Sequence, residues 1–217
     1  MADTPSCASG LFFVALGGSL GLDEADANVH LSAAMNRPLR KDAAERRGAL
    51  LSAARAVFAE EGIDAPLDHI AVRAGVGRAT LYRNYPGRRE IAEAALTEDL
   101  AELEERFKAA SEPDAFLDFL SDLSARLERN AALGGIVAAA RSQETVEALR
   151  AMIVRAAARP LAASLAAGMV RKDLALEDIR VLVAMLAAGL ANAAPGERPK
   201  LARRALQFVL DAVRLQT

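Results

Sequence analysis

The sequence has almost none of the residues that would build a disulfide framework or a metal site. Its 217 residues include one cysteine, Cys7, and two histidines, His30 and His69. A single cysteine cannot form an intrachain disulfide and suits a reducing compartment, so we expect a cytoplasmic protein. The histidines are far apart in the chain and have no cysteine near them, which argues against a zinc or iron site.

Signatures of catalysis and of membrane insertion are also missing from the sequence. It has no Ser/His/Asp order, no P-loop and no HExxH motif, so we expect neither an enzyme nor a cofactor. Its most apolar run, residues 11–22, is too short to span a bilayer. No basic residue precedes that run, as a secretory signal would require, so we expect no membrane association.

Aromatic residues make up only 4% of the chain and tryptophan is absent, whereas 53% of the residues are apolar. A core must therefore be built mainly from Ala, Leu and Val. Alanine has the highest helix propensity, and no segment shows the alternation of apolar and polar residues that a half-buried strand needs. The composition predicts an all-α fold without a sheet.

Charge is distributed unevenly along the chain, although the net charge is only −2. Residues 37–89 contain 11 Lys/Arg against 6 Asp/Glu, whereas residues 1–36 contain four acids and no base. A basic segment inside an acidic protein is typical of a nucleic-acid-binding module. Ordinary solvated helix faces give the same charge count, so charge alone leaves both interpretations open.

Residues 1–36 differ in composition from the rest of the chain. Gly17, Gly18 and Gly21 lie in or near the apolar run and oppose a stable helix there. Met35 stands just before the basic segment, where translation could also start. We predict that residues 1–36 are a disordered or non-native extension; a weakly folded apolar patch is the alternative.

After this extension the apolar residues follow helical periodicity, and glycine and proline mark the breaks. Gly62 stands where a left-handed residue would end the first helix, and Pro66 stands at the start of the second. We expect about nine helices, at residues 40–61, 67–74, 78–84, 88–108, 114–129, 131–140, 144–167, 177–193 and 197–215.

Two short helices joined by a glycine-containing turn form a helix-turn-helix pattern at about residues 66–85. Ile70, Ala71 and Leu81 would face inward, and Val76 would anchor the turn in the core. The N-terminus of the second short helix would then read DNA. Any hairpin of two helices can mimic this pattern, so the pattern alone does not decide the function.

More specific residues strengthen the interpretation. Over about residues 45–100, the sequence resembles the N-terminal domain of the TetR family of one-component transcriptional regulators. The resemblance rests on FAEEG at 58–62, Ile-Ala at 70–71, Ala-Gly-Val at 74–76, Thr-Leu-Tyr at 80–82 and Tyr-Pro at 85–86.

The resemblance implies a set of DNA-contacting residues at the start of both short helices, in the second one, and in the flanking basic segments. These are Lys41, Arg46, Arg47, Leu67, Gly77, Arg78, Thr80, Tyr82, Arg83, Asn84, Tyr85 and Arg88. Three positions depart from the family pattern: Asn84 where many members have His, Tyr85 where most have Phe, and Gly77 where Ser is common. The preferred bases therefore cannot be transferred from relatives.

The resemblance divides the chain into a DNA-binding domain at residues 40–100 and a helical effector-binding and dimerisation domain at 101–217. It implies that the last two long helices form a homodimer interface, with Val181, Met185, Gly189, Leu206, Leu210 and Val213. The same apolar residues could instead fill the monomer core. An effector pocket would be lined by Phe107, Phe116, Phe119, Met152 and Met169, although each of these could also be ordinary core.

Together these features predict a sequence-specific transcriptional regulator. We expect a homodimer that represses by binding double-stranded, palindromic operator DNA and that leaves it when a small-molecule effector binds. The alternative is a helical architectural DNA-binding protein, or an activator, without effector control.

Overall fold

The computed structural model describes residues 24–139, 143–190, 193–194 and 196–214, with side chains from Asp42 onward except that of Ala139. These residues form nine α-helices and one short 3-10 helix, and none of them forms a strand. The all-α prediction and the number of helices are confirmed. Within the described residues, no helix is both long enough and apolar enough to cross a membrane.

The first helix, α1, spans Glu24–Glu61 and begins earlier than the sequence analysis predicted. The sequence analysis interpreted residues 1–36 as a disordered or non-native extension. In the structure residues 24–36 are helical, and alanines at 25, 27, 33 and 34 favour a helix. Residues 1–23, including the apolar run, lie outside the described residues. The chain divides into two compact units after Ala43, and the second unit carries all the features described below.

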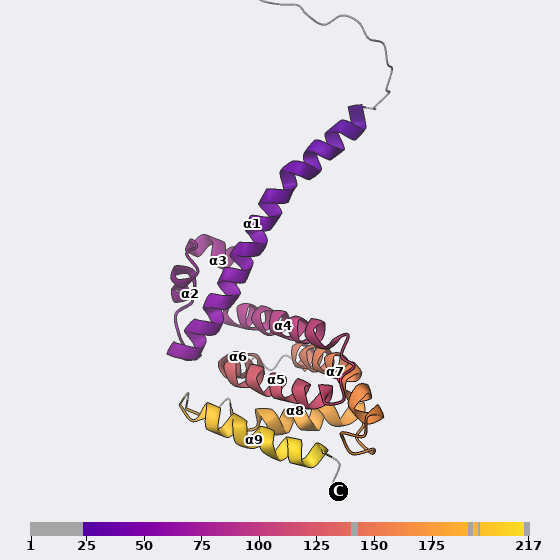
Figure 1. The fold of residues 1–217 in the computed structure, drawn as a ribbon. Coiled ribbons are helices and arrows are strands. Elements are labelled where there is room, and N and C mark those ends of the chain that lie inside the picture. Colours follow the sequence, from indigo (N-terminus) through magenta and orange to yellow (C-terminus); the bar gives the residue numbers. More distant parts are fainter. Residues whose placement is uncertain (1–23, 140–142, 191–192, 195, 215–217) are drawn as a thin grey trace, which may run out of the picture. The chain divides into compact units, whose positions relative to one another are not determined.

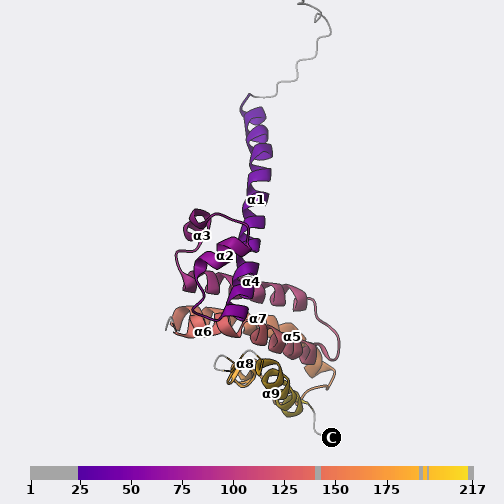
Figure 2. The ribbon, with the colours of Figure 1, turned by 90° about the vertical axis from the view of Figure 1, so that its left-hand side faces the viewer.

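Three helices follow with bounds within one residue of those predicted: α2 (Leu67–Arg73), α3 (Arg78–Asn84) and α4 (Arg88–Phe107). Gly62 ends α1 with a φ of 89°, a left-handed conformation that glycine adopts without strain. Figures 1 and 2 show α2 and α3 packed beside the C-terminal part of α1. One core joins these helices, with Leu50, Phe58, Ile70, Leu81 and Ile91 fully buried.

The remaining helices are α5 (Ala115–Arg129), α6 (Ala131–Ala139), α7 (Gln143–Ala166), α8 (Ile179–Ala187) and α9 (Arg198–Val213). The 3-10 helix η1 (Leu176–Asp178) precedes α8. Helix α4 packs on α6 and α7, and α5 packs on α7 and α9. A second core fills the space between these helices. Helices α8 and α9 lie side by side, at the end of this unit away from α2 and α3 (Figure 2).

Helix α8 is shorter than predicted. It ends at Ala187, whereas the apolar periodicity predicted a helix to residue 193. Gly189 has a φ of 77°, a left-handed conformation, and lies in the turn that ends the helix. An apolar stripe continues across this turn, and for this reason periodicity alone did not reveal the end of the helix.

Candidate nucleic-acid interface and ligand cavity

The turn between α2 and α3 is fixed by backbone hydrogen bonds and one left-handed glycine. Gly75 has a φ of 67°, and the amide of Val76 donates to the carbonyl of Ala71 over 3.0 Å. Gly77 caps α3 through its carbonyl, which accepts from the amide of Thr80 over 2.9 Å. Leu81 is fully buried and anchors α3 to the core. The predicted helix-turn-helix geometry is therefore present.

The outward face of α3 is polar and positively charged. The Arg78 side chain is 74% exposed, and Tyr82 is 45% exposed. Arg83 and Asn84 are exposed as well, while Thr80 is half-buried. Exposed arginines and an aromatic hydroxyl on a helix that projects from a packed core can donate hydrogen bonds to base edges and phosphates.

Asp68, in the first turn of α2, holds two of these side chains in place. Its Oδ2 lies 3.1 Å from Nη2 of Arg78, and its Oδ1 accepts a hydrogen bond from the Tyr82 hydroxyl over 3.4 Å. The sequence analysis did not predict this contact, because Asp68 and Arg78 belong to different helices. Asp68 therefore orients the exposed face of α3 and also places a negative charge beside it.

Two surface pairs join α2 to the end of α1. Arg73 donates to both carboxylate oxygens of Glu60, at 2.5 and 2.8 Å, and this hydrogen bonding lowers the pKa of Glu60 from its ordinary value. His69 Nδ1 lies 2.6 Å from Oε2 of Glu61. These two exposed pairs connect α2 to the end of α1.

Three of the predicted DNA-contacting residues lie at or near the core. Tyr85 is buried, which raises the pKa of its hydroxyl, and Leu67 is half-buried against the first core. Arg88 is half-buried and donates to the carbonyl of Ala65 over 2.9 Å, which ties α4 to the loop before α2. Tyr85 thus contributes packing, while Arg88 combines a structural contact with a charge near the helix-turn-helix.

The basic residues of α1 complete the predicted set. Arg46 and Arg47 are exposed near the start of the second compact unit. The side chain of Lys41 lies outside the described residues. Gly77 is exposed at the start of α3, where a side chain would meet no atom within 4 Å.

A cavity of about 310 Å³ lies among α4, α5, α6, α7 and α8. Its apolar wall is formed by Leu96, Leu100, Leu123, Leu127, Ala131, Val137, Ala138, Val146, Leu149, Ile153, Ala187 and Leu190, together with Gly134. Asp99, Arg126, Asn130 and Arg150 are its polar residues. This volume is at the lower end of the range for small-molecule sites.

The five residues predicted for an effector pocket lie elsewhere. Phe116 stacks on Phe119 with ring centroids 6.0 Å apart, and Phe107 meets Phe119 edge-on at 5.5 Å, all within the second core. Met152 is partly buried against that core, and Met169 is exposed. None of the five lines the cavity.

The polar end of the cavity is a buried network around Asp99. Arg126 donates to the Asp99 carbonyl over 2.8 Å and lies 3.0 Å from its Oδ1. The side-chain amide of Asn130 donates to Asp99 Oδ2 over 3.0 Å. Arg126 also contacts Asp122 at 3.3 Å and Glu102 at 3.6 Å, so its charge is shared among three acids.

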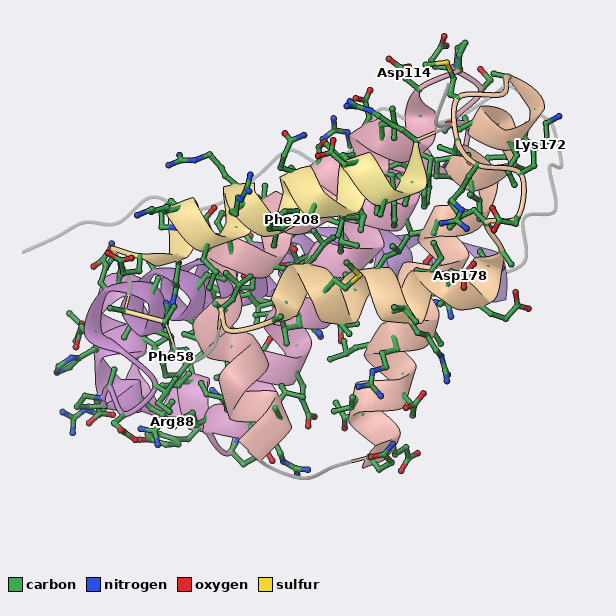
Figure 3. All side chains as sticks on the ribbon, turned by 90° about the horizontal axis from the view of Figure 1, so that it is seen from below. Phe58, Arg88, Asp114, Lys172, Asp178 and Phe208 are labelled. Atoms are coloured by element: carbon green, nitrogen blue, oxygen red, sulfur yellow. The ribbon has the colours of Figure 1, made fainter. Side chains whose placement is uncertain are left out.

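An apolar surface covers α8 and α9. Val181 is 58% exposed, Met185 41% and Phe208 54%, with Arg204 stacked over the Phe208 ring at 4.2 Å. Figure 3 looks onto these two helices and shows Phe208 on α9. The other predicted interface residues vary in exposure: Gly189 is exposed, Leu206 and Leu210 are half-buried, and Val213 is buried in the second core.

Sequence reasoning missed Phe208, Asp99 and Asn130. Phe208 lies in the correct helix, and an aromatic residue among arginines and a glutamine was the available signal. Asp99 occurs in a run of charged residues on α4, where nothing in the sequence separates a buried acid from exposed ones. Asn130 stands at the α5–α6 junction and was interpreted only as a break between helices.

Comparison with known proteins matches residues 50–95 to the family described as bacterial regulatory proteins, tetR family. A TetR transcriptional regulator from Streptomyces coelicolor is 30% identical, with a TM-score of 0.60; the match covers 79% of this chain and 99% of that one. A TetR regulatory protein from Mycobacterium vanbaalenii is 26% identical, with a TM-score of 0.61 and coverages of 82% and 100%.

A third solved structure, SmeT in complex with triclosan, is 23% identical, with a TM-score of 0.52, and shares the fold. The match covers 79% of this chain and 92% of SmeT. A search of curated proteins found no significant match.

Proposed function

Since the chain belongs to the TetR family of transcriptional regulators, we propose that it binds a palindromic operator as a homodimer and represses transcription until a small-molecule effector releases it. The observation that carries this proposal is the outward face of α3. Arg78, Tyr82 and Arg83 project from a short helix whose buried Leu81 holds it rigidly on the core. A rigid helix with exposed arginines suits readout of the major groove.

The homodimer is supported by the apolar surface on α8 and α9. A helix face with exposed valine, methionine and phenylalanine has an unfavourable contact with water, which a second copy of the same face would remove. Two-fold symmetry would then present two α3 helices to DNA. Their half-sites should lie about 34–36 Å apart, or a multiple of that distance.

Effector control is supported by the position of the cavity. Val137 on α6 lines the cavity and also belongs to the core that holds α1, α2 and α3. Leu96 on α4 does the same, just after the helix-turn-helix. A ligand that moves either helix would therefore act on the DNA-binding domain, and operator and effector would weaken each other's binding reciprocally.

A repressor needs no catalytic group, and we propose that this protein is not an enzyme. Its action on DNA would place it in the cytoplasm of the cell. The sequence of the operator and the genes it controls would follow from the DNA selected in the experiment below.

The proposal is tested by selecting duplexes that bind the purified protein from a random pool, followed by footprinting of the selected site. We expect a palindrome protected on two half-sites, and an affinity that falls steeply as salt increases, because phosphate contacts release counterions. A single protected half-site, or no enrichment of any sequence, would contradict the proposal.

The alternative is an architectural DNA-binding protein without effector control. It is distinguished by the same duplexes, used to screen small molecules for release of the bound protein. Release by at least one compound at a concentration near its Kd supports the repressor. Binding without sequence preference, together with no release by any compound, supports the architectural protein.

A further inference from the structure

The ion pairs beside the cavity form two groups that differ in net charge. The first group is the network that contains Asp99 and Arg126. Within the described residues it has three arginines and three acids: Arg106, Arg126 and Arg129 with Asp99, Glu102 and Asp122. Their formal charges cancel, and the Arg126 side chain is only 11% exposed. This group therefore offers no surplus charge to a ligand.

The second group joins α7 to α8. Oε1 of Glu147 accepts from Nη1 of Arg150 over 2.7 Å, and Oε2 of Glu147 accepts from Nη2 of Arg180 over 2.9 Å. One carboxylate is thus shared by two guanidinium groups. Two positive charges and one negative charge leave these three side chains with a net charge of +1.

Of these two arginines, only Arg150 lines the cavity. Four residues of α7 line it, at the i, i+3, i+4 and i+7 spacing of one helix face: Val146, Leu149, Arg150 and Ile153. The other three are apolar, so Arg150 is a charged residue in an otherwise apolar stripe. Its side chain is 48% exposed, which places it where the cavity meets solvent.

The guanidinium of Arg150 has donors to spare. A guanidinium carries five N–H donors in a planar fork, and the contact with Glu147 uses Nη1. Within the described part of the chain, the edge formed by Nε and Nη2 makes no ion pair. A carboxylate binds such an edge through two parallel hydrogen bonds. Because the site is half-exposed, pairing there costs less desolvation than in a buried site.

We propose that the effector is a small, mainly apolar carboxylate, whose charged group binds Arg150 and whose body lies among the aliphatic side chains of the cavity wall. This inference rests on the proposed function in taking the cavity as the effector site. It adds the charge of the ligand and the residue that selects it. A ligand carboxylate brings the net charge of the Arg150–Glu147–Arg180 group to zero, whereas a cation raises it to +2.

Three naphthalene probes of the same shape test the charge of the ligand. They are 2-naphthoate, which is an anion; 2-naphthamide, which is neutral; and 2-naphthamidine, which is a cation near neutral pH. Their affinities are measured by isothermal titration calorimetry on the full chain, without DNA. We expect 2-naphthoate to bind about tenfold or more tightly than 2-naphthamide, because it alone forms a charge-assisted pair with Arg150. The amidine should bind most weakly.

Variants locate the effect. Arg150→Met keeps an unbranched side chain and removes the charge, so 2-naphthoate should bind no more tightly than 2-naphthamide. Arg180→Met is the matched control: it removes one positive charge from the same group, outside the cavity wall, and should retain most of the preference for 2-naphthoate. Glu147→Gln removes the competing carboxylate and should increase that preference.

The fold should tolerate these three substitutions, because each of the side chains is at least 36% exposed. Thermal unfolding of each variant checks this. The affinity for 2-naphthamide gives a second check, since it should change little in all three.

The outcomes separate this inference from the proposed function. Equal affinities of 2-naphthoate and 2-naphthamide for the wild type, or no binding of any probe, would overturn the ligand class, even if another compound releases the operator. A preference for 2-naphthoate that Arg150→Met retains, or that Arg180→Met removes to the same extent, would also overturn it. A preference that only Arg150→Met removes supports the ligand class. Operator release by 2-naphthoate is then measured separately, and its absence would count against effector control and not against the anion site.

Discussion

The α3 helix and the α8–α9 pair each bury one face in a core, but their exposed faces differ in chemistry. Each buries an apolar residue, Leu81 on α3 and Leu182 on α8, and leaves the residues on the other side exposed. On α3 those residues are arginines and a tyrosine. On α8 and α9 they include valine, methionine and phenylalanine. The exposed residues therefore make the surface of α3 suited to a polyanion and the surface of α8 and α9 suited to another protein.

The difference also explains why the sequence was more informative for α3. A face that contacts DNA needs particular donors at particular positions, and these are visible as arginine, threonine and tyrosine at fixed spacing. A dimer face needs only apolar side chains of compatible shape, and apolar stripes occur in any core helix. Substitutions on each of the two faces test this comparison.

The largest effect is expected from the apolar face. Met185→Glu combined with Phe208→Glu should give a monomer, because dimerisation would bury two carboxylates without partners on each subunit. Operator affinity should fall by roughly 100-fold or more, since each half-site would then be bound independently. Analytical ultracentrifugation and operator titration measure the two effects. The control Ile63→Glu changes an exposed apolar residue in the α1–α2 loop and should remain dimeric. If the double variant is still a dimer, the interface does not lie on α8 and α9.

On the α3 face, Arg78→Ala should weaken operator binding by about 1–3 kcal/mol, roughly five- to 150-fold in Kd, if Arg78 reads a base. Fluorescence anisotropy with the operator and with single-base variants measures both the loss and its position. The preference should relax at one base pair per half-site. An equal loss of affinity for all sequences would show that Arg78 contacts a phosphate and not a base. Unchanged affinity would show that α3 does not contact the DNA.

A smaller and more selective effect is expected from Asp68→Asn. Removing this charge should raise affinity for any duplex several-fold, since an acid beside the DNA repels phosphates. It should also lower the ratio of specific to non-specific affinity, because Arg78 and Tyr82 lose the group that orients them.

Asp64→Asn is the matched control for Asp68→Asn. It makes the same change of charge at an exposed carboxylate in the turn before α2. It should change specific and non-specific affinity in parallel. An equal specificity ratio in the two variants would show that Asp68 acts only through its charge.

The smallest effect is expected from the pair that joins α1 to α2. The hydrogen bond from Arg73 lowers the pKa of Glu60 below its ordinary value of 4.5. The pair therefore stabilises the folded state at pH values above 4.5, and this stabilisation is lost as the pH falls through the lowered pKa. Arg73→Ala should therefore lose slightly less stability than the wild type on acidification below about 4.5. Thermal unfolding of both proteins across this pH range measures the difference. If the melting temperatures of the variant and the wild type fall in parallel, the pair contributes nothing to stability, as is common for exposed pairs.

Much of the fold could be predicted because its breaks are local. The bounds of α3 follow from Gly77 before it and from the Tyr85-Pro86 pair after it, and Gly62 marks the end of α1. The end of α8 could not be predicted, since Gly189 lies within a stripe that remains apolar on both sides. The sequence analysis began the first helix at residue 40, because the apolar residues become periodic only there, whereas the helix of the structure extends back to Glu24.

The candidate site divides in the same way. Exposed α3 residues were identified from a local motif, whereas the cavity depends on which helices meet in space. Phe107, Phe116 and Phe119 were predicted to line a pocket; in the structure their rings contact one another within the second core, and none of them lines the cavity among α4–α8. Asp99 on α4 and Asn130 at the α5–α6 junction are 31 positions apart in the chain, and no spacing in the sequence connects them.

Val137 belongs both to the cavity wall and to the core of the helix-turn-helix, and under the proposed function this restricts how a new effector specificity could arise. A substitution at this position is pleiotropic, because it changes the fit of the ligand and the stability of the DNA-binding domain together. Leu127 on α5 and Ala187 on α8 line the cavity from outside that core. Directed evolution towards a new biosensor should therefore begin from these two positions, where inducer specificity can drift while operator recognition is kept.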